Sequence, residues 1–236
     1  MANIALTPDQ FRNLRRAGVL YLVIIITGLG AELGLRGPLI DLGSAEATAQ
    51  AILAAPGRFR LAIAADLVMA LSDAGLAILL YLIFRAMAPG LALAAMVFRL
   101  IQTVLIAVSL MGLLTGWLIL SRADALVDAP SLALVFFELH AHGYDLGLVF
   151  FGVNSLIMGW LVWRSDIFAR AFGAGLAAAG LVYLTGSALR FFAPDLTTMF
   201  APAYGLTILA ETAFCIRLLV QKRTIAAGTG THGFAA

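Results

Sequence analysis

Charged residues are scarce in this sequence. Its 236 residues include 15 Lys or Arg and 13 Asp or Glu, together 12% of the chain. Soluble domains carry roughly twice that share, about 25%. Apolar side chains make up 62%, and the mean hydropathy is +1.01. This composition excludes an ordinary soluble domain and predicts an integral membrane protein, whose first partner is the lipid bilayer.

Cysteine and clustered basic residues are also scarce. Cys215 is the single cysteine, so no intramolecular disulfide can form, and its apolar surroundings predict a buried, unreactive thiol. No Ser or Cys has an adjacent base in a pattern typical of a nucleophile; Ser72 beside Asp73 comes nearest. The basic residues lie mostly at the ends of apolar segments, which excludes a nucleic-acid-binding pattern.

Six apolar segments are long enough to cross a bilayer, which takes about 20 residues. They cover residues 17–35, 61–84, 90–120, 133–163, 169–191 and 200–220. The sequence therefore predicts an all-α, polytopic membrane protein with a single six-helix domain over residues 17–220. Residues 1–16 are expected to be a cytoplasmic N-terminus and residues 221–236 a disordered cytoplasmic tail.

The distribution of Lys and Arg predicts the orientation. Nine lie in the termini and in the second-to-third and fourth-to-fifth turns, against five on the opposite side: Arg36, Arg58, Arg60, Arg122 and Arg190. By the positive-inside rule, both termini are cytoplasmic and the loop 36–60 is external. Ser44 as an N-cap, an alanine-rich stretch and a stop at Pro56 predict a short external surface helix in this loop.

Ionisable residues within spanning segments are costly and normally face partners or water. Counting about 1.5 Å per residue from the cytoplasmic flank puts three of them near the bilayer middle. There, Arg99 is expected between Asp73 and Glu211, with Gln102 adding hydrogen bonds. The favoured interpretation is a buried ion network that fixes helix register.

A second polar layer is expected nearer the external face. Its predicted ligand-binding residues are Glu32, Asp66, His140, Tyr144 and Asp145. Six carboxylates in the spanning segments face one certain cation, Arg99, and two titratable histidines. This excess of carboxylates favours an external ligand, such as a proton, a metal ion, or a cationic or hydroxyl-bearing molecule.

The stretch FFELHAHGYDLGLVFFG, residues 136–152, holds most of this layer. The helical period predicts two stripes on it: Glu138, His142 and Asp145 on one, and His140 with Tyr144 on the other. The first stripe offers one imidazole and two carboxylates. With a carboxylate from Glu32 or Asp66, it forms a candidate Zn²⁺ site with an open water position. In the structural alternative, Asp145 and His140 only bond to neighbouring helices.

Several stretches, in this order, resemble one bacterial family: AGVLYLVIIITGLGAE, RFRLAIAADLVMALSDAGLAILLY, FRLIQ, LHAHGYDLGLVFFG and LVWRS. The most specific positions are His140, Gly143, Tyr144 and Asp145, together with Arg60, Asp66, Asp73, Arg99 and Gln102. The chain is similar, over about residues 15–220, to the bacterial multi-pass membrane proteins grouped as the domain-of-unknown-function 4386 family. The resemblance implies about six membrane helices and residence in the bacterial inner membrane, and it implies no activity.

Three functions remain open from the sequence. The favoured one is binding or transport of a small ligand, or passage of protons, in an externally accessible polar cavity. It predicts that Asp66, Asp145 and His140 face one shared cavity. The alternatives are a metal-dependent intramembrane hydrolase acting on a lipid, and a structural or accessory membrane protein whose charges only specify folding.

Overall fold

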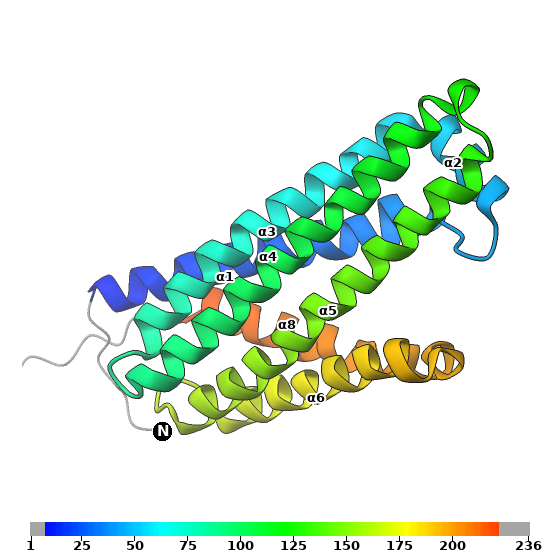
Figure 1. Ribbon diagram of the computed structural model, residues 1–236. Helices are drawn as coiled ribbons and strands as arrows, with labels where there is room; N and C mark the ends of the chain where they lie inside the picture. The colour runs from blue at the N-terminus through cyan, green and yellow to red at the C-terminus, as the bar shows by residue number, and fades with distance from the viewer. Residues whose placement is uncertain (1–7, 222–236) are drawn as a thin grey trace, which may run out of the picture.

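The computed structural model describes residues 8–221, which form an all-α bundle (Figure 1). Its α-helices are α1 (Pro8–Leu29), α2 (Ala45–Ala54), α3 (Pro56–Phe84), α4 (Pro89–Leu120), α5 (Ala129–Arg164), α6 (Arg170–Phe192), α7 (Thr197–Phe200) and α8 (Tyr204–Leu219). Short segments join them: η1 (Gly30–Arg36), η2 (Gly37–Leu39), η3 (Ala123–Ala125), η4 (Pro194–Leu196) and η5 (Ala201–Ala203). Six helical stretches are long and apolar enough to cross a membrane, which confirms the six predicted segments.

The first and last spans differ from prediction at their ends. The first runs from Pro8 to Leu39, so residues 8–16, expected outside the bundle, form the beginning of α1. Leu14 is buried there, which explains why the helix extends. The last span begins at Pro194, in the short turns before α8. The tail predicted over residues 221–236 lies outside the described residues, apart from Gln221.

The predicted short helix in the loop 36–60 is confirmed as α2. Ser44 is its N-cap, and its side chain accepts a hydrogen bond from the Ala47 backbone N–H at 3.3 Å. Pro56 does more than end α2, because it also begins α3, where the missing N–H of a first-turn proline costs nothing. Ile52 of α2 is fully buried, so this helix packs on the end of the bundle.

Glycines allow α5 to approach both of its main neighbours closely. A Cβ at Gly143 would lie 2.9 Å from the Ser109 Cβ on α4, and one at Gly180 would lie 2.7 Å from the Gly152 backbone oxygen on α5. Such contacts confirm the close helix packing that the small residues predicted. Gly18 likewise packs against Leu219, which places the beginning of α1 beside the end of α8. This side of the bundle is called the terminal end below, and the opposite side the α2 end.

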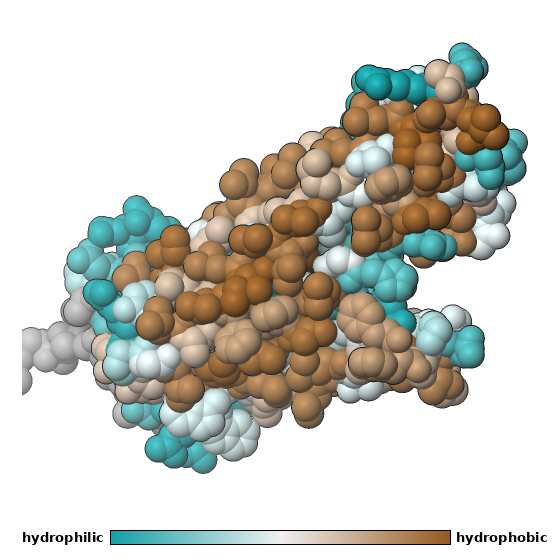
Figure 2. All heavy atoms as spheres, in the orientation of Figure 1, coloured by the Kyte–Doolittle hydropathy of each residue, from teal (hydrophilic) through white to brown (hydrophobic). Residues whose placement is uncertain are grey.

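The long sides of the bundle are apolar (Figure 2). On α4 the side chains of Val104, Val108 and Met111 follow one stripe and are about 60% exposed, as lipid-facing residues would be. Hydrophilic residues gather at the two ends and in a notch between α6 and the arm of the bundle that carries α2 (Figure 2). This pattern is that of a multi-pass membrane protein.

Two apolar clusters form the core. One, toward the terminal end, includes Leu76 and Phe84 of α3, and the other, toward the α2 end, includes Phe59 of the same helix. The buried polar residues of α3, Asp66 and Asp73, fall between the two clusters along the helix. The bundle is therefore closed by apolar packing at both ends and polar in between, and the candidate site lies in this polar layer.

Candidate functional site

A cavity of about 500 Å³ occupies the polar layer. It is lined by side chains from α1, η1, α3, α4, α5, α6 and α8. Four of the five predicted ligand-binding residues line it, namely Glu32, His140, Tyr144 and Asp145. The predicted buried network, Asp73, Arg99, Gln102 and Glu211, lines the same cavity. The two layers that the sequence analysis separated therefore form the walls of one space.

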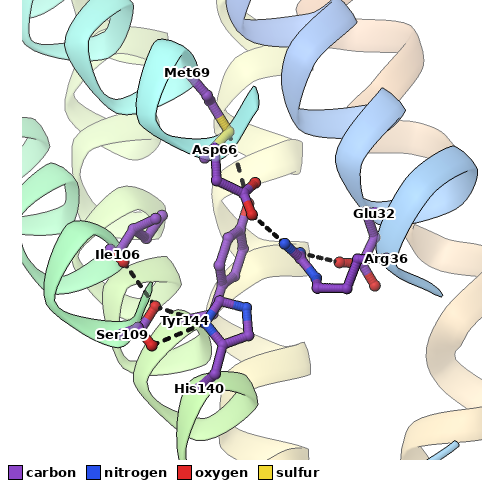
Figure 3. A network of polar contacts seen from close by, with 8 residues as sticks. All are labelled: Glu32, Arg36, Asp66, Met69, Ile106, Ser109, His140 and Tyr144. Carbon is purple, nitrogen blue, oxygen red and sulfur yellow. Dashed lines mark hydrogen bonds and ion pairs between the residues drawn. The ribbon is translucent and has the colours of Figure 1, made fainter. Parts of the chain in front are cut away.

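Arg36 joins two carboxylates at the edge of this cavity. Its guanidinium bonds both Asp66 and Glu32, and Figure 3 shows it reaching between them. Asp66 is only 1% exposed and does not itself line the cavity, because Arg36 stands in front of it. The shared cavity predicted for Asp66, Asp145 and His140 is thus formed by the last two, with Asp66 acting through Arg36.

The π-helical turn of η1 sets the direction of the Arg36 side chain. The Gly37 backbone N–H bonds the Glu32 carbonyl, five residues back, so the turn is wider than an α-helical one. Glycines at positions 30, 34 and 37 weaken the regular helix there. Arg36 is 5% exposed as a result, whereas the sequence analysis placed it in the external loop.

His140 and Tyr144 form the α5 wall of the cavity (Figure 3). The His140 Nδ1 lies 3.1 Å from both the hydroxyl and the backbone oxygen of Ser109 on α4. The Ser109 hydroxyl lies 2.7 Å from the Ile106 carbonyl and donates to it, so Nδ1–H is the donor toward Ser109. The Tyr144 hydroxyl meets only the Met69 sulfur, at 4.0 Å. Its phenol is therefore weakly held and is available to a ligand.

Asp145 is paired across the cavity with Arg190 of α6. The Asp145 side chain is 8% exposed and that of Arg190 is 37% exposed. Ser187, one turn before Arg190, donates its hydroxyl to the Asp145 carbonyl at 3.0 Å. These contacts tie α5 to α6 beside the notch seen in Figure 2.

Arg99 and Asp73 form the expected ion pair in the middle of the bundle. The Arg99 Nε and Nη2 lie 2.7 and 2.5 Å from one Asp73 oxygen, and the Thr103 hydroxyl donates to the other at 2.9 Å. The guanidinium also lies over the rings of Tyr21 and Phe151, at 5.5 and 5.0 Å. Arg99 is thus fully engaged by groups of the protein.

Glu211 departs from the predicted network. Within the described chain it forms no ion pair with Arg99, and two tyrosines hold it instead. The Tyr183 and Tyr21 hydroxyls donate to its two oxygens at 2.6 and 3.2 Å. The side-chain oxygen of Gln102 has no hydrogen-bond partner, so the bonds expected from it to Asp73 or Glu211 are not made.

The predicted stripes on α5 are regrouped by the structure. Asp145 is buried on the cavity face with His140 and Tyr144, whereas His142 is exposed and its ring lies 6.2 Å from that of Phe191. The His142 Nδ1 bonds the backbone oxygen of its own helix at position 138. No three His, Cys, Asp or Glu side chains between residues 8 and 221 are placed to hold a metal ion. The Zn²⁺ ligand set of Glu138, His142 and Asp145 is therefore not assembled.

The sequence analysis missed two of the three cavity arginines. It counted Arg99 as the one certain cation, and the structure corrects this, because Arg36 and Arg190 also lie among the carboxylates. Depth along the spans carried a usable signal. Arg36 and Asp66 lie 20 and 19 residues from the flanking arginine of their spans, and Arg190 and Asp145 also lie 20 and 19. Each pair thus shares a depth of roughly 30 Å.

The matching family model extends over residues 16–221 and is described as a domain of unknown function, DUF4386. The chain belongs to the DUF4386 family. This confirms the resemblance drawn from the sequence, and the polar cavity lies wholly inside the matched DUF4386 region. No match was found among curated proteins or among solved structures.

Proposed function

We propose that this DUF4386 protein binds a small amphipathic ligand in the cavity of its polar layer. The single observation that carries the proposal is that one space of about 500 Å³ collects nearly all the buried charges of the bundle. Small-molecule sites in proteins are typically clefts of about 300–1,000 Å³ with a few convergent polar groups. Transport of that ligand, or of protons, is a further step of the same proposal.

The apolar share of the lining supports an amphipathic occupant. The polar groups are joined on the cavity wall by aliphatic side chains from several helices, among them Ile24, Leu29, Ile106, Leu148 and Ile208. A ligand with a polar head and a short hydrocarbon part would meet both kinds of wall. A fully hydrophilic solute would leave this aliphatic surface without a matching contact.

Filling the cavity is expected to abolish ligand binding. Leu148 lines the cavity on α5, so Leu148→Trp would occupy the space, whereas Leu146→Trp would add the same bulk at a 43% exposed position of the same helix. A ligand at 100 times its Kd stabilises the folded state by about 2.7 kcal/mol. We expect amphipathic compounds to raise the melting temperature of the wild type and of Leu146→Trp by several degrees, with no shift in Leu148→Trp.

Cys215 provides the readout, because it is the single cysteine and is 1% exposed. A thiol-reactive fluorophore reacts with it only as the bundle unfolds in detergent. A screen in which no compound raises the melting temperature of the wild type, or in which Leu148→Trp responds like Leu146→Trp, contradicts binding in this cavity. Such a result would favour the structural alternative.

We also propose that the protein lies in the bacterial inner membrane with both termini in the cytoplasm and α2 outside. The positive-inside count supports this orientation. Of the five arginines assigned to the outer side, Arg36 and Arg190 pair with carboxylates in the cavity, so they weigh less as topological signals. The cavity would then open toward the outside.

Cysteine labelling is expected to report this orientation. Ala47 on α2 and Ala86 between α3 and α4 are both exposed, and the native thiol is buried. In intact cells a membrane-impermeant maleimide should label Ala47→Cys and leave Ala86→Cys unlabelled until the cells are permeabilised. The reverse pattern would show that the α2 end faces the cytoplasm.

The metal-dependent hydrolase has no comparable support. Two of its expected carboxylates, Asp66 and Asp145, are engaged by arginines, and His142 faces away from the cavity lining. The geometry therefore favours binding over metal-assisted hydrolysis.

A further inference from the structure

We infer that the polar head of the ligand is an organic cation, an ammonium group bearing an apolar tail, and that Glu211 is its counter-ion. This inference rests on the proposed binding function and names the ligand class of the same cavity. Three observations carry it: the partners of Glu211, the charge balance of the cavity and the aromatic rings around it.

Glu211 is the one cavity-lining carboxylate that has no ion pair within residues 8–221. Glu32, Asp73 and Asp145 each pair with an arginine. The partners of Glu211 are the phenol groups of Tyr21 and Tyr183, which donate hydrogen bonds and carry no formal positive charge. A buried carboxylate held in this way keeps its negative charge available to an incoming cation.

The charge balance of the site points the same way. Three arginines stand among five carboxylates: Arg36, Arg99 and Arg190 with Glu32, Asp66, Asp73, Asp145 and Glu211. Counting His140 as a further cation still leaves an excess of carboxylates. Each arginine already bonds at least one carboxylate, so an anionic ligand would have to displace Asp73, Asp145 or the Arg36 pair. A cation would meet no such competitor at Glu211.

Aromatic rings line the cavity beside Glu211. The rings of Phe151 and Tyr183 are 5.0 Å apart, and those of Tyr183 and Tyr204 are 6.0 Å apart, so the three form a continuous wall. Arg99 already lies over Phe151, which leaves Tyr183 and Tyr204 for a ligand. Aromatic faces next to a carboxylate are the surroundings that proteins use to recognise alkylated ammonium groups. Ile208, which also lines the cavity, offers an apolar surface for the tail.

Three eight-carbon probes with different heads test the inference: octyltrimethylammonium, octanol and octanoate. Full-length protein in lipid nanodiscs is titrated with each probe by calorimetry, and empty nanodiscs provide the correction for partitioning into lipid. We expect the ammonium probe to bind at least about tenfold more tightly than octanol, as a desolvated cation–π contact with a counter-ion would give. Octanoate should not bind.

Glu211→Gln keeps the shape of the side chain and removes its charge. It should weaken binding of the ammonium probe about tenfold or more and leave the octanol titration unchanged. Glu46→Gln, at an exposed position of α2, is the matched control and should bind both probes as the wild type does. Tyr204→Leu removes one aromatic face and should weaken only the ammonium probe. If Glu211→Gln does not fold, the head-group series on the wild type decides the question.

Each other outcome separates the inference from the proposed function. Equal binding of all three probes overturns the cation site and leaves an amphipathic cavity in place. Preferential binding of octanoate also overturns it and transfers recognition to the arginines. Failure of every probe to bind a folded wild type overturns the cation site, and together with a negative compound screen it overturns ligand binding in the cavity.

Discussion

Replacing Arg36 with methionine is expected to lower the free energy of unfolding by about 3–5 kcal/mol, the cost of breaking a buried ion pair from one side. Asp66 would then keep its charge at a position that is 1% exposed. One of its oxygens already has no partner within the described structure, and Arg36 bonds the other. For a chain of this length, the loss corresponds to a melting temperature lower by about 10 °C, measured in detergent with the Cys215 thiol assay.

A control and a rescue separate this charge effect from lost packing. Arg58 is exposed and bonds only the Gly34 backbone oxygen, so Arg58→Met should change the stability by less than about 1 kcal/mol. The double variant Arg36→Met with Asp66→Leu removes both charges and should recover most of the loss, because an apolar pair can replace a buried ion pair. A double variant no more stable than Arg36→Met would show that the charge pair is not the cause.

Gly173→Ala is expected to cost about 3 kcal/mol or to prevent folding, because there is no room for a methyl group between α5 and α6. A Cβ at Gly173 would lie 2.5 Å from the Trp163 backbone nitrogen and 2.6 Å from the Gly159 backbone oxygen. Backbone atoms cannot rotate away as side chains can, so the two helices would have to separate. The same thiol assay on purified protein measures the loss, and folded yield reports the extreme case.

Gly205→Ala is the matched control on α8. A Cβ there would meet no atom within 4 Å, and alanine is the better helix former. Its melting temperature should equal or exceed that of the wild type. If Gly173→Ala and Gly205→Ala behaved alike, α5 and α6 would not be held as closely as the structure has them.

The sequence carried enough signal for the spans and for the close helix contacts. Spanning segments are read from hydropathy because the bilayer requires a continuous apolar stretch, and all six are present in the structure. The Ser44 cap predicted α2, and small residues such as Gly143 and Gly180 predicted tight interfaces. The ends were less certain, since the start of α1 at Pro8 depends on the burial of Leu14 against other helices.

Candidate site residues were recovered in part. Four of the five proposed ligand-binding residues line the cavity, and Arg99 pairs with Asp73 as expected. The pairing of Glu211 with Tyr21 and Tyr183 could not be predicted, because tyrosines in apolar segments are common and their hydroxyl partners lie on other helices. Assigning Asp145 to the stripe of His142 also failed, since the bundle chooses which side of α5 is buried.

What the sequence alone determined is the solvent, the number of spans and the residue types available for a site, because these follow from local composition and from the bilayer's demand for internal hydrogen bonding. What only the tertiary structure decided is the pairing of charges. Arg36 and Arg190 lie at the ends of apolar segments and count there as flanking residues, yet a π-helical turn and the contact of α6 with α5 bring them to Asp66 and Asp145. Such pairing depends on which helices are neighbours and on their rotation, and both are set by packing across the whole bundle.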